Sequence, residues 1–388
     1  MRFTPFLLLA IVVFASACKK HNIPTPSPTN IYTVTAINSP EPGRMLLTPY
    51  SLTNSSQGMV IIMDEKGNIL QQQTTNGAAF CLNKWNIAGQ TEYTFILNDV
   101  SAYHIPLINQ LTGYVVVTDS NLNEINKINL LPHNDITTEN GQNLDVHDFI
   151  LLDNSTTVHY IAMCFYQKHV TNIPDSLHPS PGVTVVAPII QEVVNGTVIW
   201  QWDATDYPEF YANSVEGNNF SDSTVTQDYM HMNSMYIDSS DNSLICSFRN
   251  QNQIIKINRT TGAIMWRLGG KDSDFPLTPD EMTLHQHHAT LTDSNKTLLV
   301  FDDGDTVLRP YSRIVEYQLN EAAKTVTSFK AYNIPEPFSG LMGSVQKKGD
   351  TYFIGGGTAN YVLEVNYVTG QKIFEMKGTE TSYRTYKY

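Results

Sequence analysis

Three histidines recur at matching places along the chain, and their type and spacing indicate chemistry. His147 lies in VHDFILLD, His231 begins HMNSMYID, and His287 lies in QHHATLTD, each six or seven residues before an aspartate. A neutral imidazole is a competent nucleophile or base near neutral pH, and a protonated one stabilises negative charge. A single histidine is more often a hydrogen-bonded loop or core residue. Three in register, each followed by an apolar strand, favour one shared site.

One arginine is placed to serve the same site. Arg249, in CSFRNQ, stands at the end of the apolar strand that follows His231. Arginine rarely lies inside an apolar strand without an anionic or hydrogen-bonding partner, and its planar fork suits sulfate or phosphate. The alternative for Arg249 is a structural salt bridge.

A metal site is the rival use of clustered histidines. The sequence lacks HExxH and any close histidine pair with a carboxylate at ligand spacing. The carboxylates of FDDGD (Asp302, Asp303 and Asp305) could hold a cation, but Asp-Gly turns are mostly solvated hairpin ends. We therefore predict no metal ligands.

The other histidines receive lesser roles. His285 and His288 flank His287, and neighbours along a strand point to opposite faces, so both are secondary candidates. The remaining ones are expected in loops, on the surface or near the N-terminus: His21, His104, His133, His159, His169 and His178.

A repeated hairpin predicts the elements that position these side chains. Short β-rich runs alternate with turns rich in Asn, Asp, Gly and Ser, which is typical of all-β proteins. The recurrences are VIIMDEKGNILQQ, YVVVTDSNLNEINKI, IIQEVVNGTVIWQW, IIKINRTTGAIMWRL, IVEYQLNEAAKTVTSF and VLEVNYVTGQKIFEM. A second hairpin-like segment between them brings each repeat to four strands, which is one propeller blade.

The repeat therefore predicts an all-β, six-bladed β-propeller, with strands near residues 32–49 completing the short last repeat and closing the ring. A β-sandwich or a solenoid is the alternative. Equivalent positions of different blades are related by rotation about the central axis. The three histidines are thus expected to converge on the central channel.

The first residues predict export. Arg2 precedes an apolar run at 6–14 and then Ala-Ser-Ala-Cys18, the pattern of a signal peptide whose cysteine resembles a lipobox. The apolar run is too short to span a bilayer comfortably. We expect a signal peptide at 1–18 with lipidation of Cys18, a Pro/Ser/Thr-rich tether at 19–30 and the propeller at 31–388. The protein would be lipid-anchored and periplasmic, or at the outer membrane or cell surface.

The net charge and the positions of the cysteines argue against nucleic acid as a partner and against a cysteine nucleophile. The net charge of −13 gives no basic footprint and argues against nucleic acid. Cys81, Cys164 and Cys246 each lie in an apolar stretch, so we expect buried small side chains rather than nucleophiles.

Several motifs together resemble the arylsulfate sulfotransferase family. DYMHMNSMYIDSSDNSLICSFRNQNQIIKINRTTGAIMWRLGG carries H-x-N-S, S-x-R and G-x-I-x-W segments similar to that family's signature. HQHHATL with LLVFDDG, VHDFILLDN, SRIVEYQLNEAAKTV and SYRTYKY resemble further family segments. The resemblance covers most of the chain after the tether, and residues 228–304 are its most specific part.

The resemblance implies a six-bladed propeller that moves a sulfuryl group from a phenolic sulfate ester to a phenolic acceptor. The reaction is PAPS-independent, needs no cofactor and passes through a sulfohistidine. By position, His287 matches the nucleophile, and His231 and Arg249 match residues that bind the sulfuryl oxygens. His147 matches the remaining active-site histidine. Two residues match substrate-binding positions: Asn233 and Thr358.

Three departures from the family pattern keep other functions open. Asn250 stands where the family often has His, His288 where it has Asp or Thr, and too few residues precede the first blade for the N-terminal sandwich domain of some members. One alternative is a non-catalytic surface propeller that binds an anionic ligand or glycan. Another is a metal-dependent hydrolase or lyase on the same fold. All four positions that match the family's active site are retained, namely His147, His231, Arg249 and His287, and this favours the transferase.

Overall fold

The computed structural model describes residues 31–98, 104–105, 110–139, 142–152 and 158–388. Residues Tyr32–Tyr388 form one compact unit. The predicted signal peptide, the tether and Cys18 lie outside the described residues. Among the helices of the described residues, none has the length and apolarity needed to cross a membrane.

Antiparallel sheets of four or five strands make up much of this unit. In the first sheet the strands follow the order β26 (Thr381–Lys387), β2 (Arg44–Ser51), β3 (Asn54–Asp64) and β4 (Ile69–Thr75). Two further sheets have the orders β14 (Met232–Asp238), β15 (Ser243–Phe248), β16 (Gln253–Asn258), β17 (Ile264–Gly269) and β18 (His287–Thr292), β19 (Thr297–Asp302), β20 (Arg313–Asn320), β21 (Thr325–Asn333). The five-stranded sheet has the order β22 (Ser344–Lys348), β23 (Thr351–Gly355), β24 (Tyr361–Asn366), β25 (Lys372–Gly378) and β1 (Tyr32–Ile37).

The remaining strands form one nine-stranded sheet. They are β5 (Ala79–Ile87), β6 (Gln90–Asn98), β7 (His104–Ile105), β8 (Gln110–Thr118), β9 (Glu124–Ile128), β10 (Asn143–Leu152), β11 (His159–Val170), β12 (Val183–Val194) and β13 (Thr197–Asp203). The helical segments are short: η1 (Asp175–Leu177), η2 (Ala204–Asp206), α1 (Glu209–Asn213), η3 (Arg249–Gln251) and η4 (Gly357–Ala359).

The sheets are arranged around an axis as a β-propeller. The strands β5, β10, β14, β18, β22 and β26 each contact the next one, and β26 contacts β5 again, so they close a ring. Buried apolar side chains fill the spaces between neighbouring sheets, as where Trp266 and Phe275 pack edge to face with Leu298 and Val300 close by. The all-β propeller predicted from the hairpin repeat is confirmed.

The predicted number of blades is wrong. Four sheets are separate blades, not six. The reason is a short pairing between β8 and β10, Leu144 with Gly113 and Asp145 with Thr112, which joins the strands of the second and third hairpin repeats into one sheet. A two-residue ladder of this kind leaves no signal in a repeat pattern.

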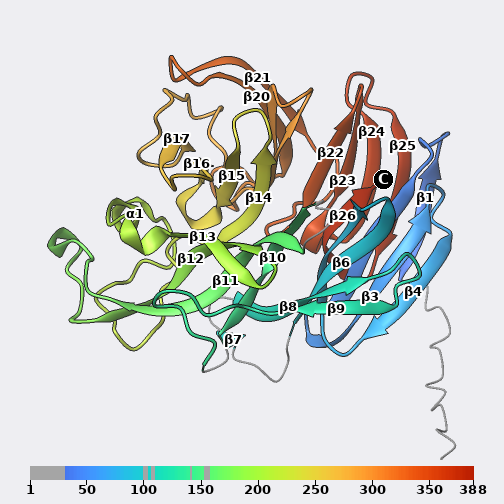
Figure 1. Cartoon of the computed structure of the whole chain (residues 1–388). Helices are drawn as coiled ribbons and strands as arrows, with labels where there is room; N and C mark the ends of the chain where they lie inside the picture. Colours follow the sequence, from blue (N-terminus) through green and yellow to red (C-terminus); the bar gives the residue numbers. More distant parts are fainter. Residues whose placement is uncertain (1–30, 99–103, 106–109, 140–141, 153–157) are drawn as a thin grey trace, which may run out of the picture. The chain divides into compact units, whose positions relative to one another are not determined.

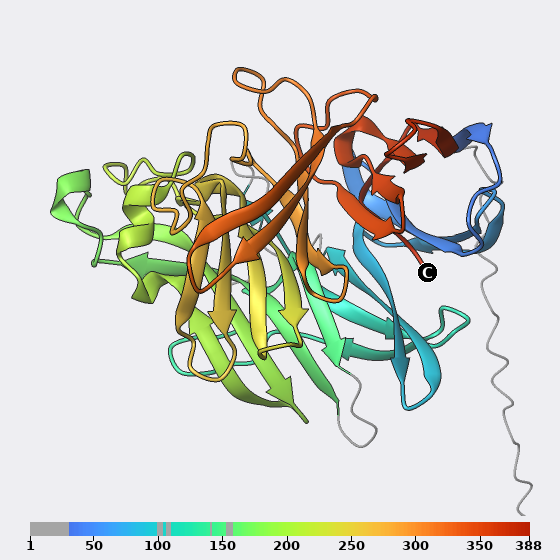
Figure 2. The same ribbon diagram turned by 90° about the horizontal axis from the view of Figure 1, so that it is seen from above.

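The ring is closed by strands from opposite ends of the sequence. β26 is the inner strand of the sheet that contains β2, and β1 pairs with β25 as the outer fifth strand of the last sheet. The first strands (blue) therefore lie beside the last ones (red) in both views (Figures 1 and 2). Our expectation that residues 32–49 complete the last repeat holds for β1, whereas β2 pairs with β26 in another sheet. Both pairings close the ring, as expected.

The three internal cysteines fulfil the expectation drawn from their apolar neighbours. Cys81, Cys164 and Cys246 are buried and free. Burial raises the pKa of each thiol, so none is a thiolate at neutral pH.

Candidate active site

The predicted site residues line a cavity of about 400 Å³ at the inner ends of the blades. His147, His231, Arg249 and His287 all contribute to it. Aromatic and apolar side chains form the rest of its wall together with a few polar groups: Tyr50, Phe80, Val146, Glu216, Gly217, Asp228, Asn250, Leu341, Met342 and Tyr383.

Neighbouring inner strands bring the histidines together. His147 lies within β10, His231 immediately precedes β14, and His287 is the first residue of β18. The chain at His231 has a left-handed backbone (φ 53°), and its carbonyl accepts a hydrogen bond from Arg249 N–H at 3.0 Å. Arg249 begins η3 directly after β15, so this bond ties the arginine to the histidine.

Each of the three histidines has a carboxylate on Nδ1. His147 pairs with Asp145 at 2.5 Å and His231 with Asp228 at 2.5 Å. His287 pairs with Asp303. A carboxylate on one ring nitrogen fixes the ring's orientation and stabilises positive charge on it.

The hydrogen bonds of His287 define its tautomer. The Met342 N–H donates to Nε2 at 3.4 Å, so Nε2 carries a lone pair and the proton lies on Nδ1, toward Asp303. Burial lowers the pKa of His287 well below its usual value, and the positive charge of Arg249 and the two other site histidines act in the same direction. His287 is thus a neutral imidazole with a nucleophilic nitrogen.

The partner of His287 is itself deeply buried. Asp303 is fully buried, and this burial raises the pKa of its carboxyl well above the usual value. The positive charge of Arg249 lowers the same pKa and offsets part of that rise. Because the ring proton of His287 lies on Nδ1, this nitrogen donates and Oδ2 of Asp303 accepts.

Aromatic rings surround the histidines. The rings of His147 and His231 lie edge to face with centroids 4.9 Å apart, and Tyr383 lies 5.4 Å from His147 and 6.2 Å from His287. Phe80 lies 5.9 Å from Tyr383 and 5.0 Å from Tyr50. The cavity wall therefore combines aromatic rings with the histidine rings.

Arg249 is the positive group of the cavity wall. Its guanidinium donates to the carboxylate of Glu216 and, at 2.7 Å, to Asn250 Oδ1. Asn250 holds its place by donating to the Asp228 carbonyl at 2.6 Å. The Glu216 side chain is 45% exposed, so the carboxylate that pairs with Arg249 is accessible to solvent.

The two predicted substrate-binding residues do not line the cavity. Asn233 is fully buried and donates to the Gln286 carbonyl at 2.9 Å, directly before His287. Thr358, in η4, donates to the carbonyl of Leu341 at 3.1 Å. Asn233 therefore contacts the residue before His287, and Thr358 contacts Leu341, which lines the cavity.

Some expectations for the other polar residues are wrong. Asp302 and Asp303 are fully buried rather than solvated, because Asp303 binds His287 and Asp302 is held by Arg309 and Arg313. His159 is half-buried in β11 and bonded to Glu192 rather than in a loop or at the surface.

The flanking histidines have separate partners. Nε2 of His285 lies 3.4 Å from a carboxylate oxygen of Glu216, and His288 lies outside this cavity. Within the described residues, no three His, Cys, Asp or Glu side chains form a group that could hold a metal ion.

The carboxylate partners of the three histidines were not predicted from the sequence. Asp145 and Asp228 lie two and three residues before their histidines, so a D-x-H and a D-x-x-H spacing was available as a signal. Glu216 and Phe80 carry no local signal, because they reach the cavity only through the fold, whereas Tyr383 lies in the SYRTYKY segment that resembles the family.

A neutral nucleophilic nitrogen faced by an arginine and two carboxylate-paired histidines suits attack on an anionic tetrahedral group. The fold and the site together define a β-propeller with a cavity, lined by histidines and an arginine, at the inner ends of its blades. The chain belongs to the arylsulfotransferase (ASST) family, whose model matches residues 21–388. Its general activity is therefore that of an aryl sulfotransferase, and its substrates are small phenolic molecules.

Other comparisons concern the fold alone. No curated protein matches the chain. A protein of unknown function from Bacteroides caccae is 9% identical with a TM-score of 0.50, over 89% of this chain and 99% of that one. The periplasmic gluconolactonase of Pseudomonas aeruginosa is 10% identical with a TM-score of 0.45, over 89% and 99%.

Proposed function

We propose that this protein transfers a sulfuryl group from a phenolic sulfate ester to a phenolic acceptor through a sulfohistidine at His287, without PAPS. The observation that carries the proposal is that Nε2 of His287 accepts a hydrogen bond and so bears no proton, while His287 shares a cavity with Arg249, His231 and His147.

In the first half-reaction, Nε2 of His287 forms a bond to sulfur as the bond between sulfur and the aryl oxygen breaks. The charge of the three equatorial oxygens is spread in the transition state, and Arg249 and a protonated His231 stabilise it. The departing phenolate takes a proton from His231 or His147 in its cationic form.

The second half-reaction runs in reverse with a new phenol. The acceptor hydroxyl returns its proton to the same histidine, its oxygen attacks sulfur, and the bond between sulfur and Nε2 breaks. The aromatic wall of Phe80, Tyr50 and Tyr383 supports binding of both aryl groups in turn.

Rapid mixing with a chromogenic aryl sulfate tests this proposal. Without acceptor, we expect release of about one equivalent of phenol, and peptide mass spectrometry should find the sulfuryl group on His287. Adding a second phenol should restore turnover. Steady release without acceptor would indicate a sulfatase, loss with a chelator a metal enzyme, and no release from folded protein a binding propeller.

Glu216 is expected to compete with the sulfate ester for Arg249. The Glu216→Gln variant removes the competing charge, so KM for the aryl sulfate should fall about two- to fivefold with kcat little changed. Glu209→Gln is the matched control, because Glu209 is 48% exposed and pairs with Arg267, away from the cavity. An unchanged KM in Glu216→Gln contradicts the competition.

We also propose that the protein is exported and anchored through a lipid on Cys18, facing the periplasm or the outside. The support is the sequence at residues 1–18. In cell fractionation, the Cys18→Ser variant should leave the membrane fraction, and retention there contradicts the anchor.

A further inference from the structure

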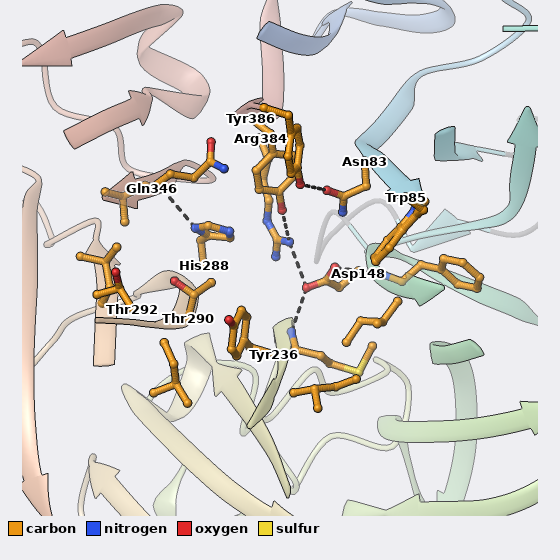
Figure 3. Close-up of a pocket in the computed structure, with 18 of the residues that line it drawn as sticks. Asn83, Trp85, Asp148, Tyr236, His288, Thr290, Thr292, Gln346, Arg384 and Tyr386 are labelled. Atoms are coloured by element: carbon orange, nitrogen blue, oxygen red, sulfur yellow. Dashed lines mark hydrogen bonds and ion pairs between the residues drawn. The ribbon is translucent and has the colours of Figure 1, made fainter. Parts of the chain in front are cut away.

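A second cavity, of about 560 Å³, lies on the other side of the inner strands from the candidate active site. Its volume is in the range of small-molecule sites in proteins. Figure 3 shows His288, Arg384 and Asp148 gathered in it, with Trp85 and Tyr236 on its walls.

Three inner strands each supply one residue to each cavity, because consecutive residues of a strand face opposite ways. The pairs, active-site residue first, are His147 and Asp148 on β10, His287 and His288 on β18, and Tyr383 and Arg384 on β26.

A hydrogen-bonded layer separates the two cavities. Arg384 pairs with Asp148 at 2.9 Å and donates to the Asn233 carbonyl at 2.5 Å, and Tyr383 donates to the same carbonyl at 3.0 Å. The second cavity therefore has its own floor, and a molecule in it would not contact His287.

His288 presents an unused donor to this cavity. The Val345 N–H donates to its Nδ1 at 3.1 Å, which places the proton on Nε2. His288 is only 4% exposed, and no hydrogen bond of its Nε2 is found within the described residues. Burial lowers the pKa of His288 well below its usual value, so the ring is neutral.

The backbone at His288 is strained to achieve this placement. Its φ is 47°, a left-handed conformation that is costly for a residue with a side chain, and the β18–β19 ladder shifts register between His287 and Thr290. Strain of this kind is typical of functional positions.

The rest of the cavity favours an uncharged, largely apolar molecule. Its walls include apolar and aromatic side chains: Trp85, Phe149, Ile150, Leu151, Leu152, Met235, Tyr236, Ile237, Leu291, Leu299 and Val345. Its charges are already paired, Arg384 with Asp148 and Lys347 with Glu316 at 2.9 Å and Asp293 at 3.2 Å. A charged ligand would find no free counter-ion among these residues.

We propose that this cavity is a second ligand site, for an uncharged aromatic molecule whose carbonyl or ether oxygen accepts a hydrogen bond from Nε2–H of His288. The aromatic walls contact the ring, and the buried donor fixes its orientation. This site is separate from the proposed transferase function and does not rest on it.

The test uses prodan, an uncharged naphthalene ketone whose emission shifts to the blue in apolar surroundings, with the full chain. We expect a saturable blue shift. His288→Asn should weaken the affinity about three- to tenfold, the usual effect of one lost hydrogen bond. Asparagine tolerates a left-handed backbone and can still accept the Val345 N–H. Thr290→Phe, which fills the cavity, should abolish binding.

His231→Asn, on the other cavity, is the matched control and should leave prodan affinity unchanged. Three results overturn the proposal: no saturable binding by wild type, unchanged affinity in either His288→Asn or Thr290→Phe, or loss of affinity in His231→Asn. Circular dichroism of each variant separates loss of the site from loss of the fold.

Discussion

The His287→Asn variant is expected to lose aryl sulfotransfer by about 10⁴-fold or more in kcat, because it removes the nitrogen that bonds to sulfur. Turnover of a chromogenic aryl sulfate with a phenolic acceptor measures the effect. His178→Asn is the control, since His178 is exposed, has a left-handed backbone that asparagine tolerates, and lies outside the cavity. Near-normal turnover by His287→Asn would overturn the nucleophile assignment.

A positioning variant sharpens this result. Asp303→Asn keeps His287 but places an amide N–H against Nδ1, which moves the ring proton to Nε2 and removes the attacking lone pair. We expect a loss of about 10² to 10⁴-fold, as for other misplaced tautomers. If Asp303→Asn loses this activity but unfolds at the same urea concentration as wild type, misfolding does not explain the loss.

The pH profile gives an independent readout. Because burial and Arg249 lower the pKa of His287 well below 6.5, the neutral form still dominates as the pH falls through that value. Activity in kcat/KM should therefore persist below pH 6.5 and decline only at more acidic pH. An acid limb centred at or above 6.5 contradicts the assignment.

The largest effect on stability is expected from Arg384→Met. Arg384 and Asp148 are both buried, and removing the arginine leaves an unpaired charge in the channel. We expect a loss of about 3–5 kcal/mol in the free energy of unfolding by urea. Lys348→Met is the control, because the pair of Lys348 with Glu41 is exposed and worth at most about 1 kcal/mol.

A double variant identifies the cause. In the wild-type structure the Met235 N–H donates to the Asp148 carboxylate at 2.8 Å. Adding Asp148→Asn to Arg384→Met removes the uncompensated charge but keeps an oxygen that can accept this hydrogen bond. Part of the lost stability should return. If the double variant is as unstable as the single one, lost packing rather than the buried charge is responsible.

The sequence predicted what depends on local pattern. The hairpin repeat indicated the propeller, because each hairpin segment contains its own turn residues and its own alternation of apolar and polar residues. The register of His147, His231 and His287 indicated a shared site, because equivalent inner positions face one axis.

Features that depend on distant contacts were not predictable. FDDG reads as a solvated turn, yet Arg309 and Arg313 pack on Asp302 and bury it together with Asp303. The second cavity was missed because strands far apart in the sequence form its walls, as the positions of Trp85, Met235 and Leu291 show. Likewise, the two residue pairs between β8 and β10 decide the number of separate blades.

The pairing of β26 with β2 has a consequence for how the protein folds. The Thr48 N–H donates to the Ser382 hydroxyl across 334 residues of sequence, so this contact carries one of the largest loop-closure costs in the chain. Folding rates fall as the sequence separation of contacts rises. Tyr383 and Arg384 come with β26, so both cavities are completed only when this slow, long-range step is made.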